Sequence, residues 1–143
     1  MMKYYKKDIN GNVTEIKEDV RDVYCTNNKL TELILPEGVK TVDCYNNKLT
    51  ELKLPKGGKY VNCNNNELTK LELPKGVEYV SCWNNNLTEL EIPKGVIYVS
   101  CYSNNLTELE LPKGGVEWVF CDYVKDISKQ FNKVEKRITI YIK

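Results

Sequence analysis

A single pattern of apolar and polar positions recurs along most of the chain with a period of 19 residues. Its clearest marker is cysteine, with spacings of 19, 19, 19, 19 and 20 between Cys25, Cys44, Cys63, Cys82, Cys101 and Cys121. Five regular units begin at Val20, Val39, Gly58, Val77 and Val96, and a sixth, degenerate unit begins at Val116 after an extra Gly115. A fixed period of this length predicts a solenoid in which each unit forms one turn and stacks on its neighbours.

Each unit divides into two halves, and both halves have the alternation that is typical of a strand. In the unit 39–57, the apolar residues Val42 and Cys44 alternate with polar residues, and Leu52 and Leu54 alternate with charged residues. A Pro-Lys-Gly sequence then ends the unit, and this combination favours a turn. We therefore expect a mostly β solenoid with short parallel strands on both sides.

The repeated unit resembles the leucine-rich repeat. The repeat pattern L-x-x-L-x-L-x-x-N-x-L is filled by Val39, Val42, Cys44, Asn47 and Leu49, and the same match runs through residues 20–121. The chain is similar to short leucine-rich repeat proteins of bacterial or bacteriophage type, although its unit is too short to hold a convex helix. The resemblance implies a binding scaffold and does not identify the partner.

Both ends of the solenoid need caps, because a bare end exposes its core and a strand edge. We expect a single domain, 1–143, with an N-terminal hairpin cap at 1–19, six repeat units at 20–121 and a C-terminal cap at 122–143. The N-terminal hairpin is indicated by alternating residues on both sides of Asn10-Gly11. At the other end, the alternation in 134–143 predicts a closing strand, and the spacing of Val124, Ile127 and Phe131 suggests a short helix.

The six cysteines invite a metal or disulfide interpretation, but buried small apolar residues explain them better. No C-x-x-C pair is present, and cysteines in register on parallel neighbouring strands do not point at each other. We therefore expect no metal and no cofactor. Free thiols and the absence of a signal peptide indicate a cytoplasmic location. Delivery into a host cell by a dedicated secretion route stays open.

Two asparagine columns follow the cysteines. The first consists of Asn28, Asn47, Asn66, Asn85 and Asn104. We expect these side chains to point inward and to pair backbone groups that the turns leave free. The asparagines before them, Asn27, Asn46, Asn65 and Asn84, are expected to face solvent at the turn. The exposed glutamate and lysine columns of the second half are interpreted as a solubilising surface.

Aromatic residues gather at the outward positions of the first half of each unit. The candidate partner-binding residues are Tyr60, Tyr79, Trp83, Tyr98, Tyr102, Trp118 and Phe120. Cross-strand pairing accounts for some aromatic residues in a sheet, but tyrosine and tryptophan are also enriched at binding hot spots. We therefore expect a protein-binding module, which could act as a small effector or inhibitor. Whether the chain is a monomer or a homodimer stays open.

Two other function classes are weaker. The aromatic residues could instead stack on nucleic-acid bases, assisted by the basic residues Lys125, Lys129, Lys133, Lys136 and Arg137. Against this alternative, the net charge is only +1, from 21 Lys+Arg and 20 Asp+Glu. An enzyme is not expected, because histidine is absent and the sequence has no Gly-rich phosphate loop or metal motif. No apolar run approaches the length of a membrane span.

Overall fold

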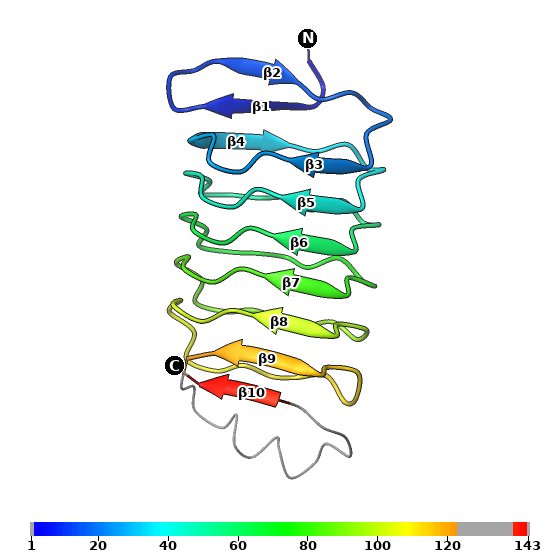
Figure 1. Cartoon of the computed structure of the whole chain (residues 1–143), viewed down its shortest axis with the longest axis vertical. Helices are drawn as coiled ribbons and strands as arrows, with labels where there is room; N and C mark the ends of the chain where they lie inside the picture. The colour runs from blue at the N-terminus through cyan, green and yellow to red at the C-terminus, as the bar shows by residue number, and fades with distance from the viewer. Residues whose placement is uncertain (1, 123–138, 143) are drawn as a thin grey trace.

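The computed structural model describes residues 2–122 and 139–142, and in this part every regular element is a strand. The strands are β1 (Tyr5–Asp8), β2 (Val13–Glu15), β3 (Asp22–Tyr24), β4 (Leu30–Ile34), β5 (Thr41–Asp43), β6 (Tyr60–Asn62), β7 (Tyr79–Ser81), β8 (Tyr98–Ser100), β9 (Trp118–Cys121) and β10 (Thr139–Ile142). Seven of them form one parallel sheet in the order β10-β9-β8-β7-β6-β5-β3 (Figure 1). The predicted β-solenoid, with turns of about 19 residues, is confirmed.

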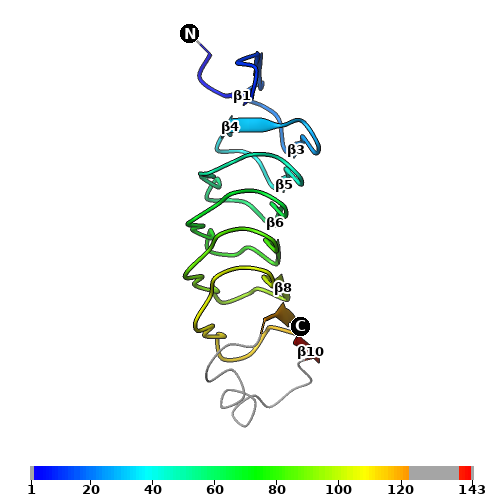
Figure 2. The same cartoon turned by 90° about the vertical axis from the view of Figure 1, so that its left-hand side faces the viewer.

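The strands of successive units lie in step with one another. The central valine of each strand pairs with the valine of the next unit, as Val61 does with Val80. Viewed from the side, the chain forms a stack of similar coils (Figure 2). The inward valines, cysteines and leucines of all units form one continuous core, in which residues such as Val61, Cys63 and Leu68 have no exposed surface. Each unit is therefore stabilised mainly by its two neighbours.

The second side of the solenoid differs from the prediction of strands on both sides. Within the described residues, β4 is the one strand that a repeat unit forms on that side, and it pairs with β1 of the N-terminal hairpin. Later units are joined there by backbone bonds such as the one from the Glu67 N–H to the Leu49 carbonyl. The Leu49 N–H instead donates to the side chain of Asn66. Inward leucines still bury this side, but its backbone lacks the repeated bonds of a sheet.

The predicted N-terminal hairpin is confirmed, and it extends the second side of the first unit rather than the seven-stranded sheet. Strands β1 and β2 pair antiparallel around a turn in which Gly11 has a φ of 84° and Asp8 accepts the Asn10 and Asn12 N–H groups. The sheet order is β2-β1-β4, so the hairpin continues the second side of the first unit. The Tyr5 hydroxyl donates to Glu32 at 2.5 Å and links the hairpin to β4.

At the C-terminal end, β10 adds to β9 in parallel, in agreement with the predicted closing strand. The suggested helix near Val124, Ile127 and Phe131 and the basic cluster between Lys125 and Arg137 lie outside the described residues. The described part has no helix of the length and hydrophobicity that crossing a membrane requires.

The turn after each of the first five cysteines uses a left-handed backbone conformation. The φ is 53–56° at Asn27, Asn46, Asn65 and Asn84, and it is 54° at Ser103, which takes the same place in the fifth unit. Asparagine tolerates this conformation better than other residues with a Cβ atom. This tolerance explains why asparagine recurs at the first position of the pair.

Replacing Ser103 with asparagine is expected to stabilise the fold. Ser103→Asn places a residue that tolerates positive φ where serine is strained, so the free energy of unfolding should rise by about 0.5–1 kcal/mol. Urea unfolding followed by circular dichroism measures the change. The reciprocal substitution Asn84→Ser should lower the free energy of unfolding. If both variants were as stable as the wild type, the positive φ at this position would not explain the preference for asparagine.

Candidate functional site

The outward positions of β3 and β5–β9, together with the residue that follows each inward cysteine, form one surface, which we call the strand face. Its first column is Asp22, Thr41, Tyr60, Tyr79, Tyr98 and Trp118. Its second column is Tyr24, Asp43, Asn62, Ser81, Ser100 and Phe120. Its third column is Thr26, Tyr45, Asn64, Trp83, Tyr102 and Asp122. All seven aromatic residues predicted from the sequence lie on this face.

Three tyrosines of the first column form a stacked ladder. The ring centroids of Tyr60 and Tyr79 are 4.5 Å apart with an interplanar angle of 8°, and those of Tyr79 and Tyr98 are 4.3 Å apart at 5°. The in-register parallel strands impose this spacing, because neighbouring strands lie about 4.8 Å apart. Burial and the nearby Tyr98 and Tyr60 hydroxyls raise the pKa of Tyr79 well above its ordinary value. The ladder is therefore partly structural, as cross-strand pairing predicts.

A second group of rings lies in the third column. Trp83 and Tyr102 stack with centroids 5.3 Å apart at 6°, and Trp83 also approaches Tyr45 at 6.2 Å and 55°. Tyr45 and Trp83 belong to alternate units, with Asn64 between them. Asn64 is only 5% exposed, and its Oδ1 accepts the Ser81 hydroxyl and the Trp83 N–H. Tyr45 was not among the predicted site residues, although its place in the Trp83 column was a signal for it.

Trp118 belongs to the same column as the stacked tyrosines but does not stack on them. Its strand neighbour Tyr98 instead contacts Phe120, with centroids 5.5 Å apart and planes tilted by 40°. Trp118 has no ring contact among residues 2–122, and it is 42% exposed. Ile97, whose carbonyl accepts the Trp118 N–H, is also 42% exposed. Two large apolar side chains, Trp118 on the strand face and Ile97 just outside its first column, are thus open to solvent near the C-terminal end of this face.

The inward asparagines form the predicted ladder, and Asn66 shows its geometry. Its Oδ1 accepts the Leu49 N–H at 3.0 Å, and its Nδ2 donates to the Cys44 and Cys63 carbonyls at 3.1 and 3.0 Å. Asn47, Asn85 and Asn104 make equivalent bonds. The asparagine column therefore pairs backbone groups of two neighbouring units and leaves no amide free for catalysis.

Asn28 is the exception in this column. It belongs to the first unit, so no preceding unit lies above it, and its side chain is exposed. Its Nδ2 donates to the carbonyl of Thr26, and its backbone N–H donates to the Oδ1 of Asn47. The prediction that all five asparagines point inward is wrong at this position.

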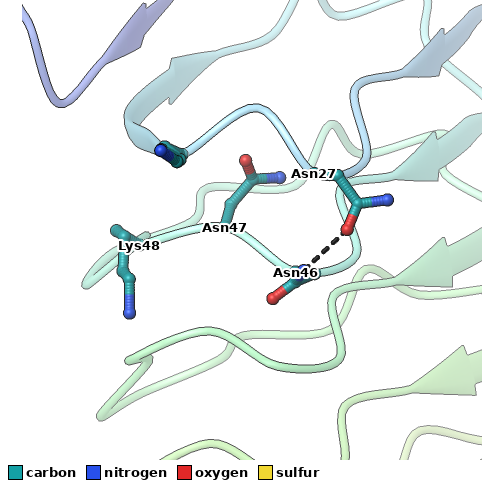
Figure 3. A pocket seen from close by; sticks show the side chains of 5 residues that line it. Asn27, Asn46, Asn47 and Lys48 are labelled. Atoms are coloured by element: carbon teal, nitrogen blue, oxygen red, sulfur yellow. Dashed lines mark hydrogen bonds between the residues drawn. The ribbon is translucent and has the colours of Figure 1, made fainter.

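The outer asparagines line an open hollow beside the ladder. Asn27, Lys29, Asn46, Asn47 and Lys48 surround a volume of about 220 Å³ (Figure 3). The Nδ2 of Asn46 donates to the Oδ1 of Asn27 at 2.6 Å, and Asn84 donates to Asn65 in the same way. The amides of the hollow are therefore bonded to one another or to backbone, as Asn47 is. This hollow offers no set of converging free groups.

The cysteines behave as small apolar residues. All six are buried and free, and burial raises the pKa of every thiol, to about 11 at Cys25 and at Cys121. A raised pKa suppresses the reactive thiolate. In the part of the chain that the structure describes, no three acidic, histidine or cysteine residues gather as metal ligands.

Comparison of the chain with protein-family models, with curated proteins and with solved structures finds no match. The structure shows a repeat β-solenoid, and this architecture serves many functions. The leucine-rich repeat resemblance and the role of the strand face therefore enter below as proposals.

Proposed function

We propose that the chain is a protein-binding module of the leucine-rich repeat type, without enzymatic activity, that contacts its partner through the strand face. The observation that carries this proposal is the collection of aromatic rings on one side of the solenoid, ending at the exposed Trp118 and Ile97. Exposed apolar groups that lie together mark interaction sites in many proteins. Tyrosine and tryptophan supply large contact areas with few rotatable bonds.

The rigidity of the face supports this role. The Tyr60–Tyr79–Tyr98 stack holds its rings in place before any partner arrives, so binding would lose little side-chain entropy. Stacked repeat units with a preformed aromatic face fit an effector or inhibitor that covers part of a larger protein. We place this activity in the cytoplasm of a bacterial or phage-infected cell, because the buried free thiols suit a reducing compartment.

Nucleic-acid binding is the second candidate, and two features of the strand face disfavour it. Bases stack on open ring faces, whereas the faces of Tyr79 are both covered by neighbouring tyrosines. The three columns also contain no lysine or arginine to contact phosphates. The basic residues that favoured this alternative, from Lys125 to Arg137, lie outside the described residues.

The proposal predicts that loss of the exposed rings abolishes partner capture. The bait proteins are the wild type, Trp118→Ala, and the triple variant Tyr79→Ala/Tyr98→Ala/Trp118→Ala, each used on lysate of the producing cells. We expect a protein captured by the wild type to be lost with the triple variant and weakened at least about tenfold with Trp118→Ala, which is the size of a hot-spot effect. Quantitative mass spectrometry measures the captured amounts.

A control variant on the opposite side separates binding from folding. Thr50→Ala/Thr69→Ala/Thr88→Ala changes three exposed residues of the second half and should capture as much partner as the wild type. Because Tyr79 and Tyr98 also stabilise the sheet, circular dichroism must show that the triple variant is folded. If all baits captured equal amounts of the partner, the binding site would have to lie outside the strand face.

A further inference from the structure

The strand face excludes cationic side chains. Its eighteen positions hold Asp22, Asp43 and Asp122 and no lysine or arginine, although the chain has 21 Lys+Arg. The lysines that precede the first column are directed elsewhere. The ammonium group of Lys40 lies beside Gly57 in the turn of its unit, and that of Lys59 donates to the Gly76 carbonyl and to Glu78. The face is therefore acidic wherever it is charged.

Two of the three carboxylates lie together at the N-terminal end of this face. Asp22 is on β3 and Asp43 is on β5, and the register places Asp22 opposite Thr41 and Tyr24 opposite Asp43. Neither carboxylate has an ion pair within the described residues, whereas Glu18, Glu67, Glu72 and Glu78 do. Asp43 accepts only a long bond from the Tyr45 N–H, at 3.3 Å. Both carboxylates are thus available to a cation from outside.

Two rings that lack a stacked ring on at least one face adjoin these carboxylates. Tyr60 is the first ring of the ladder, so Tyr79 covers one of its faces, while the preceding residue in the column is Thr41. Tyr24 is 68% exposed and has no ring contact among residues 2–122. Asp43 and Tyr24 are both close enough to Tyr60 to raise its pKa, in addition to the effect of burial. A cation at this place would meet ring faces and negative charge together.

We propose that this end of the strand face, formed by Asp22, Tyr24, Asp43 and Tyr60, binds an arginine-bearing extended segment of the protein partner. Guanidinium groups pair with the Asp22 and Asp43 carboxylates while their planes lie on the open faces of Tyr24 and Tyr60. Arginine fits better than lysine, because its planar group stacks on aromatic rings and still donates hydrogen bonds in its own plane. This inference rests on the proposed function and specifies the chemistry of the partner.

Labelled octa-arginine is the probe, and fluorescence anisotropy at low salt measures its binding. We expect the wild type to bind it and Asp22→Asn/Asp43→Asn to bind it about five- to tenfold more weakly, which is the effect of two exposed charge contacts. Asparagine at position 43 keeps an oxygen for the Tyr45 N–H. The matched control Glu51→Gln/Glu89→Gln removes two exposed carboxylates from the opposite side and should bind like the wild type. Octalysine should bind more weakly than octa-arginine.

Four results would overturn the inference: no binding of octa-arginine, equal binding by Asp22→Asn/Asp43→Asn, an equal loss with the control variant, or equal affinity for octalysine. Tighter binding of a single-stranded oligonucleotide than of octa-arginine would also overturn it, in favour of nucleic acid. The capture experiment on Trp118 uses other residues. If that experiment succeeds and octa-arginine fails, the protein-binding function stands without this partner chemistry.

Discussion

Raising the pH above about 9 should unfold the solenoid within roughly two pH units. Burial raises the pKa of all six cysteine thiols in the folded state, whereas an unfolded chain exposes thiols with an ordinary pKa of about 8.5. Because the folded pKa values are the higher ones, their stabilisation is complete below the unfolded value and is lost as the pH rises toward the folded values. Six thiols together contribute a slope of up to about 8 kcal/mol per pH unit. About one to two pH units at this slope therefore remove as much as the whole free energy of unfolding of a domain, about 5–15 kcal/mol.

Circular dichroism between neutral pH and pH 11 measures this transition. The control is Cys63→Val/Cys82→Val, which replaces two fully buried thiols with similar apolar groups that do not titrate. With a third of the titrating thiols removed, the midpoint should move upward by about half a pH unit. A midpoint that does not move would show that other groups, such as tyrosines or lysines, govern alkaline unfolding.

Truncating Asn66 should be among the most damaging single substitutions in the chain. Asn66→Ala would leave the Leu49 N–H without its partner in the core, while the Cys44 and Cys63 carbonyls would each lose one of two donors and keep Asn47 and Asn85. A buried group that loses its only hydrogen bond costs about 1–3 kcal/mol, and the loss of one of two donors at each carbonyl adds to this cost, so we expect a loss of about 2–4 kcal/mol in the free energy of unfolding. Urea unfolding followed by circular dichroism measures it.

The same substitution at the start of the column is the control. The Asn28 side chain is exposed and donates to the Thr26 carbonyl, so Asn28→Ala should lower the free energy of unfolding by less than about 1 kcal/mol. If Asn66→Ala and Asn28→Ala lowered the free energy of unfolding equally, the bonds from each asparagine to the preceding unit would not contribute to stability. The contrast therefore tests the cooperation between units rather than a preference for asparagine.

The period of the sequence was sufficient to predict the columns. Once Cys44 and Cys63 are placed in the same position of successive turns, the inward cysteines, the paired asparagines and the aromatic face follow from strand alternation. The hairpin was predictable from Asn10-Gly11, because that turn is determined by local chemistry. These features depend on residues that are close in sequence or one period apart.

The remaining features depend on which of several possible partners a group bonds to or packs against, and the repeat pattern does not determine this choice. The second half of each unit alternates like a strand, yet the Leu49 N–H bonds to an asparagine side chain and the sheet does not form there. Trp118 occupies the column of the tyrosine ladder, but Phe120 packs on Tyr98 instead. Tyr45 contacts Trp83 of the next unit but one, and the residue between them in the column, Asn64, is buried. These contacts depend on which of several available partners each group meets in the folded chain.

The regular step between units also bears on how such a protein can evolve. The Asn66 side chain bonds only within its own unit and to the preceding one, and β6 pairs only with β5 and β7. A duplicated or deleted 19-residue unit would therefore leave the hairpin and the last strands with the same neighbours as before. Each such event would lengthen or shorten the strand face by about 4.8 Å. Recombination within the gene can thus adjust the reach of this surface to a partner without redesigning the core.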